Sequence, residues 1–257
     1  MKDGKGTAKV NIALRGPDDA LLDLRDLEDE LEVAENAGAM ATILRLRARM
    51  AREREVIQPA VLWLDRTGPE PILAVEISDQ FALAGPGEWT DWIAVEFPML
   101  GGMMNLTGWT RFLFSGVEPF EVYAAPIQID PWNPAMPVSS PEEASAELAD
   151  AIGPYYTQGF PDAYKAYKVG LLDTPGFVSQ SDTVMEERGA MLDWALDGLD
   201  QDGGVLFFYV GSLDLRCHML WFAQDVEHPH KEAGALENHD HEIDRIYALL
   251  QETLARA

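Results

Sequence analysis

Asp214 and His218 are the two residues whose types and spacing best fit a chemical role. On a helix, residues four apart lie on the same face, so both side chains can reach one ion. Carboxylate oxygen and imidazole nitrogen are ordinary ligands of zinc, and also of manganese and iron. The spacing therefore predicts a pair of metal ligands, and a helix-capping aspartate beside a half-buried histidine explains it equally well.

The remaining histidines follow this pair closely in the sequence. His228 and His230 flank a proline, and His239 and His241 flank an aspartate. Either pair can supply further metal ligands, but His-x-His in an acidic, glycine-containing loop is also common on solvated surfaces. We therefore expect these four histidines to be surface residues and keep only the first pair as predicted ligands.

No catalytic nucleophile can be identified. The chain has no G-x-S-x-G turn, no phosphate-binding G-x-x-x-x-G-K-[ST] loop and no H-E-x-x-H zinc motif. Ser212 has no evident base beside it, and Cys217 lies in an apolar stretch that favours packing over reactivity. Two protein ligands are also fewer than the three of a typical catalytic zinc site. The sequence thus predicts part of a metal site, with the catalytic residues unknown.

The residues before the predicted ligands indicate the scaffold that would position them. Val205 to Val210 is an unbroken apolar and aromatic run between glycines, which is typical of a strand buried on both faces of a parallel sheet. In open α/β sheets, ligands bind beyond the carboxyl ends of the strands, and Asp214 and His218 follow at that end. Helical patterns flank the run, from Ser140 to near Gly153, from Ser181 to about Leu196 and from His239 to Ala257.

The chain is predicted to contain three segments. Residues 1–58 form an N-terminal helical approach segment with a short strand at Val10 to Leu14. Residues 59–129 contain short apolar or alternating runs separated by glycine and proline turns, which predicts a β-rich, sandwich-like insertion subdomain. Residues 130–257 form a partial catalytic core of α/β type. The β-rich segment contains Trp89, Trp92 and Trp109. Tryptophans in such a unit are more typical of a core than of a ligand-stacking platform, so we expect these three to be core residues.

The formal net charge of -25 over 257 residues argues against nucleic acid or an anionic membrane as a partner. Binding nucleic acid or an anionic membrane requires Lys and Arg to neutralise phosphate. An acidic surface attracts divalent cations, although a halophile-like surface has the same composition. Cys217 is the only cysteine, so no intramolecular disulfide forms. There is neither an apolar signal core nor a membrane-spanning segment, so we expect a cytoplasmic protein from the sequence as it stands.

Several stretches of the sequence resemble one known family. The run from Phe208 to Trp221, followed by Asp225 to Pro229, is similar to the type I phosphodiesterase/nucleotide pyrophosphatase branch of the alkaline phosphatase superfamily. Upstream stretches in the same order resemble a bacterial subgroup of that branch: Gly87 to Trp92, Glu118 to Ile127, Ser140 to Glu143, Gly153 to Gly159 and Glu186 to Arg188.

The resemblance implies an α/β sheet flanked by helices, with insertions that cap the active site. It also implies two metal ions, usually zinc, around a Thr or Ser nucleophile. A D-x-x-x-H pair ligates one of these ions in the family, and Asp214 and His218 match it. The family's first metal-binding Asp and its nucleophile belong on an early strand, and nothing before residue 60 matches them. Its second Asp–His pair and its last His would fall beyond Ala257.

From the resemblance we expect a fragment with a partial alkaline-phosphatase-like sheet and part of a two-metal site. It would belong to a metal-dependent phosphohydrolase that acts on a small phosphate ester, and it would be inactive alone. A sheet that lacks strands exposes apolar surface, which predicts self-association or a complementing chain. A truncated start would also make export compatible with the sequence. The alternative is a non-catalytic binding or assembly module in which Asp214 and His218 are structural.

Overall fold

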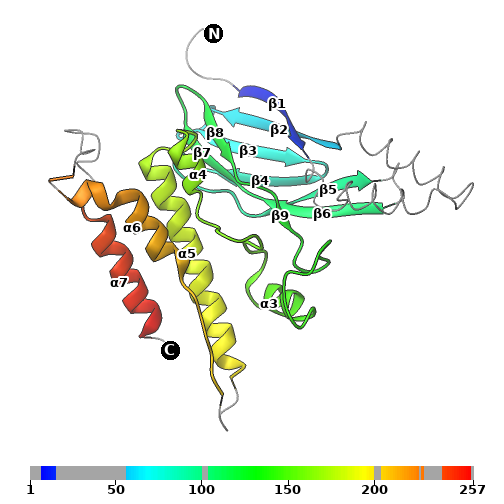
Figure 1. The fold of residues 1–257 in the computed structure, drawn as a ribbon. Coiled ribbons are helices and arrows are strands. Elements are labelled where there is room, and N and C mark those ends of the chain that lie inside the picture. The colour runs from blue at the N-terminus through cyan, green and yellow to red at the C-terminus, as the bar shows by residue number, and fades with distance from the viewer. Residues whose placement is uncertain are drawn as a thin grey trace, which may run out of the picture. The chain divides into compact units, whose positions relative to one another are not determined.

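The computed structural model describes residues 7–15, 56–99, 104–199, 204–225, 227–228 and 239–255. The chain divides into two compact units, residues 1–137 and 138–257. Among the described residues every strand belongs to the first unit and every helix to the second (Figure 1). The fold is therefore mixed α/β, and the described sheets are all antiparallel.

Three antiparallel sheets build the first unit. The largest has the strand order β1-β2-β3-β4, the second has the order β5-β6-β9, and the third pairs β7 with β8. The strands are β1 Thr7–Arg15, β2 Ile57–Asp65, β3 Ile72–Ile77, β4 Gln80–Ala84, β5 Ile93–Met99, β6 Met104–Thr110, β7 Phe112–Gly116, β8 Glu121–Ala124 and β9 Gln128–Ile129. The predicted strand at Val10 to Leu14 is confirmed within β1, whereas the predicted helical part of residues 1–58 lies outside the described residues.

Alternation along the strands positions the core of this unit. In β3, Leu73, Val75 and Ile77 are buried, while the residues between them are only half-buried. These side chains join buried residues of β2, β5 and β7 in one apolar cluster. A strand with this pattern packs one face inward and turns the other toward solvent. The short apolar runs of the sequence therefore coincide with strands that share a core.

The tryptophans of the first unit are engaged by neighbouring side chains. The guanidinium of Arg111 lies 5.3 Å from the ring centroid of Trp89 and 5.4 Å from that of Trp92. Trp109 donates a hydrogen bond from Nε1 to Oδ1 of Asp130 at 3.1 Å. These contacts favour a structural role over a ligand-stacking platform.

Five helices build the described part of the second unit. They are α3 Ala144–Ile152, α4 Tyr164–Lys168, α5 Thr174–Asp197, α6 Gly211–Gln224 and α7 Glu242–Leu254. None of the helices in the described ranges combines the length and the hydropathy needed to cross a bilayer. The helices predicted from periodicity correspond to α3, α5 and α7.

The predicted ends of α3 and α5 agree with the structure more closely than their predicted starts. α3 begins after the predicted Ser140, and Oγ of Ser139 accepts a hydrogen bond from the backbone N–H of Ser145 at 3.1 Å. It ends at the predicted Gly153, whose φ of 83° lies in the left-handed region that favours glycine. α5 begins before the predicted Ser181, because Asp173 caps the helix and proline occupies its first turn.

The prediction of a buried strand at Val205 to Val210 is wrong: residues 204–210, called the extended segment below, are extended but largely exposed. The segment belongs to no sheet among the described residues, and Val205, Phe207 and Tyr209 are 97%, 86% and 61% exposed. Periodicity alone cannot show what surrounds an apolar run, because burial on both faces depends on neighbouring strands. In the part of the chain that the structure describes, no strand lies beside this segment and no parallel pairing occurs.

Candidate metal-binding site

Helix α6 carries both predicted ligands and is held in place by its other face. It begins at Gly211, directly after the extended segment, and its buried residues include Leu215, Leu220 and Ala223. Asp214 lies in the first turn, where a carboxylate interacts favourably with the positive end of the helix dipole. Asp214 and His218 therefore do lie on one helix, as a shared face for the two ligands requires.

The geometry of the pair suits two ligands of one ion. Nε2 of His218 lies 3.4 Å from Oδ1 of Asp214, and the two side chains are 69% and 60% exposed. A tetrahedral zinc ion with bonds of about 2.1 Å to oxygen and nitrogen separates neighbouring ligand atoms by about 3.4 Å. The same spacing also suits an exposed ion pair. Within the described ranges, no group of three or more His, Cys, Asp or Glu side chains is arranged to hold a metal ion.

The other histidines make their recorded contacts elsewhere. Nδ1 of His239 lies 3.4 Å from Oε1 of Glu242, and Nε2 of His241 lies 3.8 Å from the same oxygen. The ring of His228 lies 6.0 Å from that of Phe222. His230 lies outside the described residues. Among the described histidines of this group, none forms a three-ligand cluster with Asp214 and His218.

A buried charged cluster, formed by Arg216, Asp182, Glu242 and Arg245, fixes α6 against α5 and α7. Arg216 is fully buried and donates from Nη2 to Oδ1 of Asp182 at 2.7 Å, and its Nη1 lies 3.6 Å from Oε2 of Glu242. Arg245 of α7 binds the same two carboxylates. Arg216 and Asp214 differ by about 200° around the helix, so the buried arginine anchors the face opposite the exposed pair.

This cluster was not predicted from the sequence. Asp182 and Arg245 are 63 residues apart, and no local pattern joins them. The available signal was an arginine at position 216 inside an otherwise apolar stretch, because a buried arginine requires carboxylate partners.

Ser212 does have a carboxylate neighbour, contrary to the expectation from the sequence. Its Oγ donates a hydrogen bond to Oδ2 of Asp162 at 2.9 Å. Burial raises the pKa of Asp162, against the opposing effect of the hydrogen bond from Ser212. Ser212 and Asp162 are only 1% and 2% exposed, so a substrate cannot reach this hydroxyl in the conformation described. The pair connects α6 to the segment before α4.

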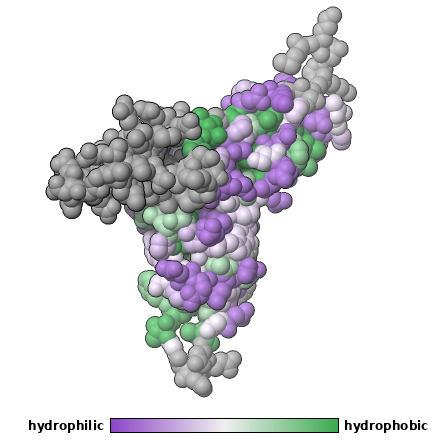
Figure 2. Space-filling model, turned by 90° about the vertical axis from the view of Figure 1, so that its right-hand side faces the viewer, coloured by the Kyte–Doolittle hydropathy of each residue, from purple (hydrophilic) through white to green (hydrophobic). Residues whose placement is uncertain are grey.

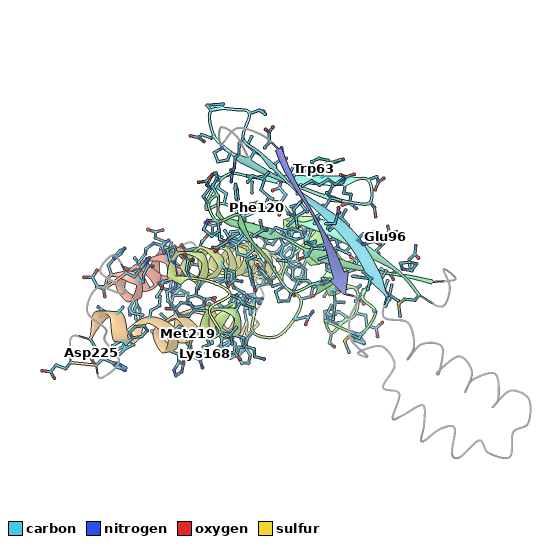
Figure 3. The ribbon with its side chains drawn as sticks, turned by 90° about the horizontal axis from the view of Figure 1, so that it is seen from above. Trp63, Glu96, Phe120, Lys168, Met219 and Asp225 are labelled. Atoms are coloured by element: carbon cyan, nitrogen blue, oxygen red, sulfur yellow. The ribbon has the colours of Figure 1, made fainter. Side chains whose placement is uncertain are left out.

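Cys217 has the packing role that its apolar surroundings predict. It packs with Met219, labelled in Figure 3, beside Phe177 and Leu220. Burial, and then the negative charge of Asp214, raise the pKa of the Cys217 thiol. A thiol held protonated is a poor nucleophile. The predicted metal ligands remain the aspartate and the histidine.

Comparisons with models of protein families, with curated proteins and with solved structures find no match for this chain. The resemblance of individual stretches to the phosphodiesterase branch of the alkaline phosphatase superfamily therefore stays a prediction.

Proposed function

We propose that Asp214 and His218 are two ligands of a divalent metal ion, zinc, in a site that further polypeptide completes. The separation of 3.4 Å between the carboxylate oxygen and the imidazole nitrogen carries this proposal, since it equals the spacing of neighbouring ligands on tetrahedral zinc. Both side chains are open to solvent, so an ion can reach them without rearrangement of the chain. The buried contacts of Arg216 support a fixed helix beneath the pair.

The reaction class that best accommodates this half-site is metal-dependent hydrolysis of a small phosphate ester. The sequence stretches that resemble phosphodiesterases support this class, as does the position of the pair beyond the end of the extended segment. In a complete site the metal ions would act as Lewis acids on the phosphoryl group. The extended segment would then be one strand of an alkaline-phosphatase-like sheet whose other strands lie outside the described residues.

This proposal predicts zinc binding without turnover by the isolated chain. Two ligands hold zinc weakly, and the described residues offer no accessible nucleophile beside them. We expect the occupancy to approach one zinc ion per chain only as free zinc is raised well above the micromolar range in equilibrium dialysis at moderate salt, and we expect no robust hydrolysis of an aryl phosphodiester. Cobalt(II) in place of zinc would report nitrogen ligation by its visible absorption.

The matched control is the exposed pair Asp240 and His241, whose atoms lie 3.6 Å apart on adjacent residues. His218→Ala and Asp214→Ala should each abolish the zinc site, whereas His241→Ala should retain it. Equal loss in all three variants would indicate diffuse attraction of cations to an acidic surface. No zinc bound by the folded chain would refute the half-site. Hydrolysis that Asp214→Ala abolishes would instead show that the site is already complete.

An assembly module is the second candidate, and the exposed apolar side chains of residues 205–209 favour it. In that case Asp214 only complements the helix dipole and His218 only pairs with it. The two candidates differ in the effect of His218→Ala. A structural histidine contributes a few tenths of a kcal/mol to the free energy of unfolding and nothing to zinc binding, since it is an exposed i,i+4 partner.

A further inference from the structure

Helix α4 ends in a tight turn that places two apolar residues beside two lysines. The backbone N–H groups of Gly170 and Leu171 donate to carbonyls of the last turn at 3.1 and 2.9 Å, and Gly170 has a φ of 73°, which together form a Schellman motif. The backbone N–H of Val169 donates to the carbonyl of Lys165 at 3.2 Å. The chain therefore folds back against the turn of α4 that carries Lys165 and Lys168.

The side chains of this turn are open to solvent. Val169 and Leu171 are 72% and 68% exposed, and Lys165 and Lys168 are exposed as well. We call these four residues the basic-apolar patch; Lys168 is labelled in Figure 3. The ammonium groups of the two lysines lie 5.9 and 5.8 Å from the centroid of one ring, that of Tyr164. Both positive charges therefore gather around a single aromatic side chain.

The positive charges of the patch are not neutralised by the described part of the chain. No carboxylate of the described ranges forms an ion pair with Lys165 or Lys168. Between Asp150 and Asp173 the only acidic residue is Asp162, and it is 2% exposed. The whole chain carries 44 Asp and Glu in 257 residues, so a stretch this long without an exposed carboxylate is unusual for it. The patch is a positive region in an acidic protein.

We infer that the basic-apolar patch is a docking surface for a short acidic segment of a partner protein that also carries aliphatic side chains. The carboxylates of that segment lie over the two ammonium groups, and its aliphatic side chains cover Val169 and Leu171. Both kinds of contact are needed, because exposed ion pairs contribute little by themselves. Charge identifies the sign of the partner, and the exposed aliphatic pair identifies its second chemical property.

The small extent of the patch favours a narrow partner over a membrane or a nucleic acid. At physiological salt a charge acts over about 8 Å, so a single segment on the last turn of α4 is influenced mainly by the two lysines. Acidic residues outnumber basic ones by 44 to 19, and strongly hydrophilic residues cover much of the face that Figure 2 shows. A broad anionic surface would therefore also meet carboxylates of this chain.

Fluorescence anisotropy with the full chain tests the inference. The probe is a short labelled peptide with leucine at helical spacing and glutamate at the other positions. We expect a dissociation constant on the order of 100 µM, because so small a contact lies below the range of stable interfaces. Raising sodium chloride from about 0.1 M to about 1 M should weaken binding at least about threefold, since the screening length falls from about 10 Å to about 3 Å.

Two matched probes separate the two kinds of contact. The same peptide with glutamine in place of glutamate keeps the aliphatic side chains and loses the charge. The same peptide with serine in place of leucine keeps the charge and loses the aliphatic side chains. Each should bind at least about fivefold more weakly than the original peptide, because each removes one of the two contributions.

Substitutions on the chain locate the binding surface. Lys168→Gln and Leu171→Ser should each raise the dissociation constant at least about threefold. The matched controls lie in the first unit and should leave the constant unchanged. Lys9→Gln removes another exposed lysine, whose ammonium lies 4.4 Å from the ring centroid of Trp63, and Leu83→Ser removes another leucine, which is 61% exposed.

Three results would each overturn the inference. The first is that the folded chain fails to bind the leucine–glutamate peptide. The second is binding that strengthens with salt, which would show that repulsion from the acidic surface outweighs attraction to the patch. The third is an equal effect of the patch variants and their controls. Binding to phosphatidylserine vesicles without binding to the peptide would assign the patch to a lipid surface and would likewise overturn it.

Discussion

Replacement of Arg216 by methionine tests the part of the structure on which the candidate site depends. Methionine retains an unbranched apolar stem and removes only the guanidinium. The variant loses the hydrogen bonds to Oδ1 of Asp182 at 2.7 Å and to the carbonyl of Val178 at 3.3 Å, and the ion pair with Glu242. It leaves Arg245 in contact with both carboxylates.

The expected loss in the free energy of unfolding is about 3 kcal/mol. A hydrogen bond between charged groups contributes about 1.5–3 kcal/mol, and a buried carbonyl left without a donor costs about 1–3 kcal/mol. Breaking a buried ion pair costs about 3–5 kcal/mol in full, but Arg245 remains to compensate Asp182 and Glu242. We therefore take the lower end of the range of about 3–5 kcal/mol for breaking a buried ion pair.

Urea unfolding followed by far-ultraviolet circular dichroism provides the assay. All the described helices belong to the second unit, so the helical signal reports on the unit that contains Arg216. The control is Asp214→Asn on the same helix, whose partner His218 is 69% exposed, and it should cost about 1 kcal/mol or less. A loss below about 1 kcal/mol for Arg216→Met would refute the view that the buried cluster anchors α6.

Two further predictions concern the same unit. Gly153→Ala should lower the free energy of unfolding by about 1 kcal/mol, because alanine is strained at a φ of 83°. Gly159 does not have a positive φ and has open space around its Cα, so Gly159→Ala should change the free energy of unfolding by only a few tenths of a kcal/mol. Equal effects of the two substitutions in urea unfolding would contradict the assignment of Gly153 as the residue that ends α3. Asp162 has a pKa raised by burial, so the folded state holds its proton more tightly than the unfolded state. Its contribution to stability is present at low pH and is lost as pH rises through the raised pKa. The stability difference between the wild type and Asp162→Asn should therefore fall with rising pH above the ordinary value, and a difference that rises would show that the carboxylate is stabilised in the fold.

The first unit could be predicted from the sequence because its pattern is local. Alternation in residues such as Leu73, Val75 and Ile77 reports directly on which face of a strand is buried, and glycine and proline mark the turns. The end of α3 at Gly153 was predictable for the same reason. The spacing of Asp214 and His218 likewise fixed their shared face once a helix was present.

The second unit was less predictable because its determinants are not local. The cluster around Arg216 joins residues of three helices, and its partners cannot be recognised from spacing. The run from Val205 to Val210 has the composition of a buried strand, but its burial depends on neighbours that the described residues do not supply. An apolar run specifies that contacts are needed without specifying where they come from.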